Sequence, residues 1–267
     1  MSERVDLYSA YGNFSDPVLD VIRKETFGVD IGQNSWVTSG EYERFLPALE
    51  ITPDHHVLEV ASGSGGPALY VARALGCRVT GVDNNESAVA TATRLAAESK
   101  QADKVQFQIA DASTRLPFDD DTFDALICID AINHLPERLA VLREWHRVLR
   151  PGRKALFTDP VVITGPVTND ELALRSSVGL FLFVPSGTNE ALIEGAGLRL
   201  VRQDDVSDNA VLIASRWHRA RQAHRAELLR IEGHERFEGL QRFFEAVRDL
   251  TNERRLTRIA YVVEKPD

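Results

Sequence analysis

The stretch that decides the fold is residues 57–68, VLEVASGSGGPA. It begins with a short apolar run that is typical of a buried parallel strand. Gly63 and Gly65 follow, and glycines allow both a tight turn and a close approach of a ligand to the backbone. Pro67 suits the first turn of a helix, where its missing N–H has no partner to lose. The stretch therefore predicts a strand, a glycine turn and a helix start whose N–H groups can bind an anionic or polar ligand.

Two classes of ligand fit this turn. The pattern Gly63-x-Gly65-x-x-Ala68 satisfies the dinucleotide fingerprint, which favours a nicotinamide cofactor. Glu59 stands at the end of the strand, ahead of the glycines, where a carboxylate could reach an ammonium group. A pyrophosphate would gain nothing from an acid in that place. The acid therefore favours a ligand with an ammonium group, and the dinucleotide stays open as the alternative.

The rest of the chain alternates strands with helices. Apolar or alternating runs predict strands at 57–60, 77–82, 104–110, 123–129, 154–158, 198–203 and 259–263. Such alternation predicts a doubly wound, mostly parallel sheet, in which ligands bind beyond the carboxyl ends of the strands. Polar side chains that could act on a ligand follow these ends: Glu59, Asp83, Asp111, Asp130, His134 and Asp159.

Helical segments at both ends of the chain are expected to cover this edge. Residues 1–50 form a predicted N-terminal helical lid, and 51–267 form the main domain, with substrate-cover insertions at about 160–185 and 205–255. The apolar run 177–184 suits an enclosed pocket for a small molecule. Aromatic side chains expected to contact that molecule are Tyr8, Tyr11, Trp36, Phe181 and Phe183.

Composition excludes several classes of protein. The length of 267 residues fits one large α/β domain, and the formal net charge of −9 argues against a nucleic-acid surface. Cys77 and Cys128 lie in apolar contexts typical of buried, reduced thiols, and neither has metal-ligand spacing. No apolar signal segment or membrane-length run is found, so we expect a cytoplasmic protein with no metal and no membrane partner.

At the glycine turn the chain resembles the class I S-adenosyl-L-methionine (SAM) methyltransferases, in particular the type 11-like group that acts on small molecules. The first motif of that family reads acid-x-Gly-x-Gly-x-Gly. Glu59, Gly63 and Gly65 match it, and Ala61 replaces the first glycine. The pattern Leu-Pro-Phe at 116–118 followed by Phe-Asp at 123–124 is similar as well. The resemblance implies a Rossmann-like, seven-stranded, mostly parallel sheet with helices on both faces and helical lids at both ends.

The resemblance also implies SAM as the cofactor and S-adenosyl-L-homocysteine as the product. It assigns Asp83 to the ribose hydroxyls, although a nicotinamide enzyme would use such an acid in the same way. It assigns Asp111 and the backbone of Ala112 to the adenine ring. The cofactor-binding residues expected on this basis are Glu59, Ala61, Gly63, Gly65, Asp83, Asn84, Asp111, Ala112, Asp130, Gln33 and Ser35.

Methyl transfer is an in-line displacement, so an enzyme of this kind mainly aligns the nucleophile. His134 is the candidate base because imidazole titrates near neutral pH, and Asp159 is expected to orient it or share its role. The segments around these residues are similar to sarcosine/dimethylglycine N-methyltransferases and to a rebeccamycin sugar O-methyltransferase. The alternative is that His134 only begins a helix and packs.

Other functions stay open at this point. An NAD-dependent oxidoreductase and a non-catalytic SAM-binding protein both remain alternatives. A nucleic-acid methyltransferase is disfavoured, since residues 130–133 read Asp-Ala-Ile-Asn where amino-group enzymes show an Asx-Pro-Pro-aromatic motif. The expected partner is therefore a small-molecule acceptor with an amine or a hydroxyl group. The protein itself is expected to be a monomer or a homodimer.

Overall fold

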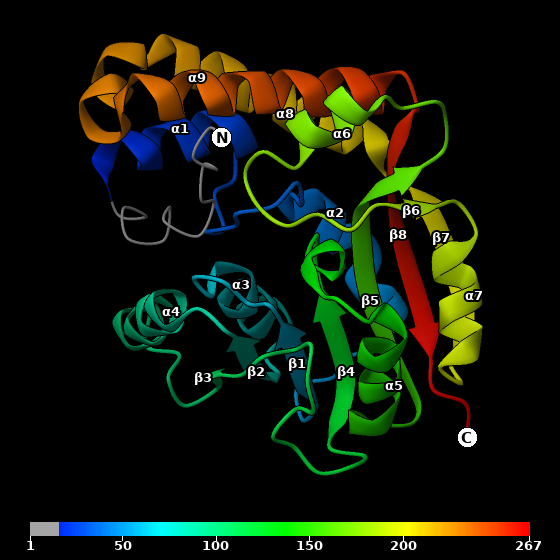
Figure 1. Ribbon diagram of the computed structural model, residues 1–267. Helices are drawn as coiled ribbons and strands as arrows, with labels where there is room; N and C mark the ends of the chain where they lie inside the picture. The colour runs from blue at the N-terminus through cyan, green and yellow to red at the C-terminus, as the bar shows by residue number, and fades with distance from the viewer. Residues whose placement is uncertain (1–15) are drawn as a thin grey trace.

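The computed structural model describes residues 16–267 and shows a central sheet between helical layers (Figure 1). The strands run in the order β3-β2-β1-β4-β5-β8-β7, and β6 pairs with β5. Their bounds are β1 His56–Val60, β2 Arg78–Asp83, β3 Val105–Ile109, β4 Phe123–Cys128, β5 Leu149–Ile163, β6 Val184–Pro185, β7 Arg199–Asp205 and β8 Leu256–Glu264. All pairs are parallel except those of β8, which runs antiparallel to β5 and β7. The predicted Rossmann-like class is confirmed.

The sheet holds eight strands where the sequence predicted seven. The additional strand is β6, a two-residue strand that pairs with Val162 and Ile163 at the end of β5. The prediction missed it because it ended the fifth strand before Pro160, whereas β5 continues to Ile163. Pro160 is accommodated at an irregularity in the pairing with β8, where the register shifts between Asp159 and Val162.

Helices cover both faces of the sheet. The helical elements are α1 Pro17–Phe27, α2 Ser39–Phe45, η2 Leu46–Leu49, α3 Gly66–Leu75, α4 Glu86–Glu98, η3 Ile132–His134, α5 Arg138–Val148, α6 Asn169–Arg175, α7 Thr188–Gly195, α8 Ser207–Ala223 and α9 Arg225–Asn252. Side chains of α5 and α7 pack on one face, and those of α2, α3 and α4 pack on the other. Between residues 16 and 267, no helix combines the length and apolar character needed to cross a membrane.

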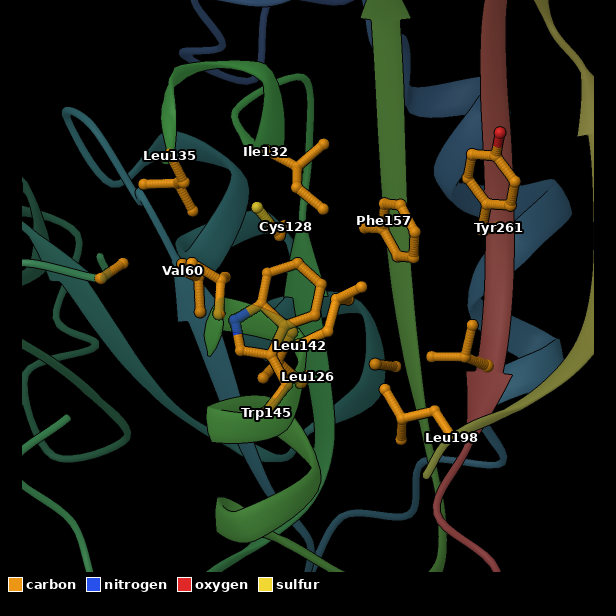
Figure 2. Packing of buried hydrophobic residues seen from close by; sticks show 14 of the residues in the cluster. Val60, Leu126, Cys128, Ile132, Leu135, Leu142, Trp145, Phe157, Leu198 and Tyr261 are labelled. Atoms are coloured by element: carbon orange, nitrogen blue, oxygen red, sulfur yellow. The ribbon is translucent and has the colours of Figure 1, made fainter. Parts of the chain in front are cut away.

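The core on the α5 face is built around aromatic rings (Figure 2). The rings of Trp145 and Phe157 meet edge to face with centroids 5.6 Å apart, and Phe157 stacks on Tyr261 at 4.8 Å. Each fully buried aromatic or aliphatic side chain of this kind stabilises the fold by roughly 1.5–3 kcal/mol. Cys128 is buried in the same cluster, and both it and Cys77 are free thiols, as predicted. This packing fixes the ends of β4 and β5 relative to each other.

The glycine turn between β1 and α3 is set by packing as much as by ligand access. Gly65 has a φ of 81°, and a Cβ there would lie 2.5 Å from the ring of Phe107 and 2.7 Å from the Cβ of Ala92. Any side chain at this position would therefore separate the turn from β3 and α4. Ala61 has a φ of 56°, a left-handed conformation that explains why the related motif carries glycine there.

The helical segments from the two ends of the chain form one layer. Helix α1 packs against α8, and α8 and α6 pack against α9. Ile22 of α1 shares a buried cluster with Leu228 and Phe237 of α9. In Figure 1 this layer lies above the end of the sheet to which the arrow of β4 points. The predicted cover of the carboxyl edge therefore combines residues that are about 200 positions apart in sequence.

Candidate functional site

Two adjoining cavities lie between the carboxyl ends of the strands and the helical layer. The first cavity follows the ends of β1 to β4 and combines acidic and amide side chains with apolar ones, and the second is bounded by aromatic rings of α8 and α9. Four residues line both cavities and mark the junction between them: Asn34, Asp130, His134 and Phe181. Of the acids predicted at the strand ends, Asp83, Asp111 and Asp130 line the first cavity, whereas Glu59 and Asp159 line neither cavity.

The first cavity brings together most of the residues expected to bind the cofactor. Its lining includes Ala61, Asp83, Asn84, Asp111, Ala112 and Asp130. The buried carboxylate of Asp83 accepts hydrogen bonds from the backbone N–H groups of Gly63 and Asn85, each at 2.9 Å. Burial raises the pKa of Asp83, and these two donors oppose the rise. The bonds tie the end of β2 to the glycine turn and orient the carboxylate toward the cavity rim.

Glu59 lies behind the glycine turn with an unsatisfied carboxyl group. Its side chain is 5% exposed, and Oε2 has no hydrogen-bond partner among the described residues. Burial raises the pKa of Glu59 to about 8, and the nearby charge of Asp83 adds to the rise. A buried acid of this kind is neutral at pH 7 and ionises when a cation binds beside it. The site is therefore suited to an ammonium group, the kind of ligand that the sequence favours.

The loop before α2 contributes differently from what was expected. Gln33 is buried: its Oε1 accepts from the Ile31 N–H at 2.9 Å and its Nε2 donates to the Val37 carbonyl at 3.3 Å. Gln33 thus holds the loop and does not line the first cavity. Ser35 lines only the second cavity, whereas Asn34 between them lines both.

Asp130 anchors that loop to the sheet. Its Oδ2 accepts from the backbone N–H of Trp36 at 2.9 Å, and its Oδ1 accepts from Arg258 Nε and Thr158 Oγ1, both at 2.7 Å. Arg258 is fully buried and also donates to both carboxylate oxygens of Glu41. The network joins α2, β4, β5 and β8. Because the Asp130 carboxylate already accepts from three protein groups, its main role is to hold the residues around the junction in place rather than to accept hydrogen bonds from a ligand.

His134 lies at the junction in a defined tautomer. Its Nδ1 is 2.5 Å from the carbonyl oxygen of Leu180, which can only accept, so the proton is assigned to Nδ1. Nε2 then carries the lone pair and accepts from Asn133 Nδ2 at 3.1 Å. Its ring meets Phe181 edge to face, with centroids 4.6 Å apart. Burial lowers the pKa of His134 and the charge of Arg175 lowers it further, so the imidazole is neutral at pH 7.

The expected pair of His134 and Asp159 is not formed. Asp159 is completely buried, forms an ion pair with Arg138 and accepts from Asn189 Nδ2 at 2.9 Å. Asp159 lies two residues after Phe157 on β5, and side chains two apart share a face. That face is covered by α5 and α7, which carry Arg138 and Asn189. Asp159 therefore holds these helices to the sheet and does not orient the imidazole.

The second cavity is bounded by stacked aromatic rings. Trp36 stacks on Phe243 with centroids 6.3 Å apart, and Trp217 stacks on Phe244 at 5.7 Å. Trp36 and Phe181 were expected at an acceptor site; the three rings of α8 and α9 were not. Their only sequence signal is the presence of large aromatic residues in an otherwise charged helical segment.

Of the other residues expected near the acceptor, Phe183 does not line this cavity. Phe183 packs against Ala246 and Leu250 and stacks behind Phe181 at 6.5 Å. Tyr8 and Tyr11 lie outside the described residues. Within 16–267, no group of three or more histidine, cysteine, aspartate or glutamate side chains is arranged to hold a metal ion.

Comparison with known proteins identifies relatives of the chain. Residues 57–152 match the family described as a methyltransferase domain. Methyltransferase GfsG of Streptomyces halstedii is 35% identical over 172 residues, which cover 62% of this chain and 60% of that protein. The 27-O-demethylrifamycin SV methyltransferase of Amycolatopsis mediterranei is 29% identical over 84% of this chain and 82% of its own.

Among solved structures, phosphoethanolamine N-methyltransferase 2 of Haemonchus contortus, in complex with phosphomonomethylethanolamine and S-adenosylhomocysteine, has the same fold. Its TM-score is 0.82 at 18% identity, over 97% of this chain and 59% of that one. The chain thus spans about 60% of the length of both GfsG and this structure. Neither comparison supports the oxidoreductase alternative.

Proposed function

We propose that the chain, whose residues 57–152 match a methyltransferase domain, transfers a methyl group from SAM to a small molecule held in the second cavity. The observation that carries this proposal is the junction of the two cavities at His134. A cavity lined by acidic side chains at the carboxyl edge adjoins an aromatic one, and a neutral imidazole, whose Nε2 lone pair accepts from Asn133, stands where they meet. This arrangement supports transfer between a bound cofactor and an enclosed acceptor.

The residues present fit SAM. The orphan Oε2 of Glu59 would pair with the ammonium group of the methionine part, and burial would strengthen that pair. Asp83, oriented by two backbone donors, would accept from ribose hydroxyls, and Asp111 with the backbone of Ala112 would hold the adenine. When bound, SAM supplies an electrophilic methyl group on a sulfonium.

The protein residues would align the acceptor and accept its proton. In-line transfer depends chiefly on alignment, which the rings of Trp36 and Phe181 would provide. His134 Nε2 would take the proton of a hydroxyl or ammonium acceptor, with its ring fixed by the bond from Nδ1 to Leu180. Asn133 would have to release Nε2 for this step, since its amide occupies the lone pair.

The helical layer of α1, α8 and α9 would serve as the cover that excludes water from the acceptor. Leu19 and Arg23 of α1 line the second cavity together with Trp217 of α8 and Phe244 of α9. Because both ends of the chain contribute walls, opening this layer would be the route by which the acceptor enters. The oligomeric state proposed from the sequence is a monomer or homodimer.

The test is to measure cofactor binding and turnover separately. Calorimetry with S-adenosylhomocysteine and with NADH should show binding of the first alone. Incubation with SAM and a panel of small phenols, carboxylic acids and amines, followed by mass spectrometry, should show a product heavier by one methyl group. Binding without turnover of any acceptor would favour a non-catalytic SAM-binding protein, and binding of NADH alone would overturn the proposal.

A further inference from the structure

Arg175, the last residue of α6, is a buried cation without hydrogen-bond partners at its tip. It is 1% exposed, and neither Nη1 nor Nη2 has a partner among the residues that the structure describes. A guanidinium carries five N–H donors, and leaving them unsatisfied in the interior costs free energy. Among the described residues, no hydrogen bond at Nη1 or Nη2 offsets the cost of burying this group.

Three rings surround the guanidinium, and all three line the second cavity. Its carbon atom lies 4.7 Å from the ring centroid of Phe181, 5.1 Å from that of Phe243 and 5.9 Å from that of Trp36. Cation–π contacts of this kind offset part of the desolvation of the charge. Burial lowers the pKa of Arg175 to about 10, so the group stays positive at neutral pH.

The acids whose charges act on Arg175 are engaged elsewhere. They are Asp130 and Asp159. Asp130 is bonded to Arg258, and Asp159 is bonded to Arg138. These carboxylates balance the charge of Arg175 at a distance, but they leave its planar pair of N–H donors unused. Such a pair matches the two oxygens of a carboxylate.

We propose that the acceptor carries a carboxylate group, which binds Arg175 and anchors the molecule beside His134. The inference rests on the proposed function and narrows the acceptor class from small molecules in general to carboxylic acids with an apolar or aromatic body. The positive charge also disfavours cationic amines at the junction, because like charges repel. Phe181 is only half-buried, and its ring is the one that must turn aside to admit the carboxylate.

Two probes of equal shape test the proposal. Binding of benzoate and of benzamide is measured by calorimetry in the presence of saturating S-adenosylhomocysteine and again without it. The wild-type protein should bind benzoate at least about tenfold more tightly, since a bidentate charged pair replaces a neutral contact. Arg175→Met should remove this preference. Arg175→Lys should keep part of the preference for benzoate, because the positive charge remains but the paired N–H donors of the guanidinium are lost. Arg242→Met, at an exposed arginine of α9, is the matched control and should leave the preference unchanged.

Thermal unfolding separates a ligand-binding role from a structural one. Replacing an unpaired buried charge with an apolar side chain of similar length should leave the melting temperature of Arg175→Met equal or higher. No preference for benzoate in the wild type, or a preference that survives in Arg175→Met, would overturn the proposal. If Arg175→Met does not fold, Arg175→Lys serves in its place: a preference for benzoate as large as that of the wild type would also overturn the proposal. If the proposed function is wrong, S-adenosylhomocysteine should not bind. The preference for benzoate can still be measured in that case, because it is also tested without S-adenosylhomocysteine.

Discussion

Replacing Glu59 with glutamine should make the protein more stable at high pH and weaken its binding of SAM. Glutamine has the shape of the protonated acid and can still accept from the backbone N–H of Ala68, but it cannot ionise. The folded protein holds the proton of Glu59 up to a pH of about 8, whereas the unfolded chain releases it near 4.5. Between these values the native state binds one more proton than the unfolded state. The stability contributed by this group is therefore present in full below pH 4.5 and is lost as the pH rises to about 8.

The magnitude follows from this interval. Each pH unit in which the folded state holds one extra proton changes stability by about 1.4 kcal/mol. Between pH 6 and pH 9 the wild-type protein without cofactor should lose roughly 3 kcal/mol through this residue, an upper estimate because Glu59 and Asp83 interact. Urea unfolding at several pH values measures the loss. Glu59→Gln should lack it, and Glu43→Gln, at an exposed position on α2, should retain the wild-type profile.

Binding of SAM should show the opposite dependence on pH. Since the carboxyl must ionise to pair with an ammonium group, the affinity of the wild type should rise by up to about tenfold per unit until pH 8. Binding at pH 7 should release a proton, which calorimetry in two buffers of different ionisation enthalpy detects. In Glu59→Gln the affinity should be weaker and this release absent. Parallel stability profiles for wild type and variant, or an unchanged proton release, would refute the reasoning.

Three further substitutions address other parts of the site. Asp83→Ala should weaken SAM binding by roughly 1.5–3 kcal/mol, the range for hydrogen bonds to a charged group, and unchanged affinity in calorimetry would remove the ribose role. His134→Gln should lower kcat by about 10²–10⁴-fold with little effect on SAM affinity. The wild-type activity should fall only below the ordinary histidine pKa, because burial lowers the pKa of His134, and near-normal kcat in the variant would exclude the base. Gly65→Ala should destabilise the protein by about 2–4 kcal/mol in urea, through strain and overlap with Phe107, against about 1 kcal/mol for Gly28→Ala, where a Cβ meets nothing within 4 Å. Equal losses in the two glycine variants would show that packing at Gly65 is not the cause.

Local sequence determined the sheet and the first cavity. The strand, turn and helix at residues 57–75 depend on apolar periodicity and glycine conformation, which neighbouring residues dictate. Parallel strands then bring their carboxyl ends to one edge, so Asp83, Asp111 and Asp130 could be placed together without a structure. The choice of an ammonium ligand over a pyrophosphate also followed from one residue, Glu59, and its position ahead of the glycines.

Only the tertiary structure decided the partners of the buried charges. His134 follows β4 and Asp159 lies within the adjacent β5, yet the alternation of side chains along β5 turns Asp159 toward Arg138 of α5. The aromatic wall of the second cavity depends on α1, α8 and α9 packing together from opposite ends of the chain. Arg175 carries no local signal at all: its importance comes from the rings around it and from the arginines that already occupy Asp130 and Asp159. Such pairings are set by contacts between residues that are distant in sequence. The free energy of each pairing depends on which charged or hydrogen-bonding groups the neighbouring residues leave without partners.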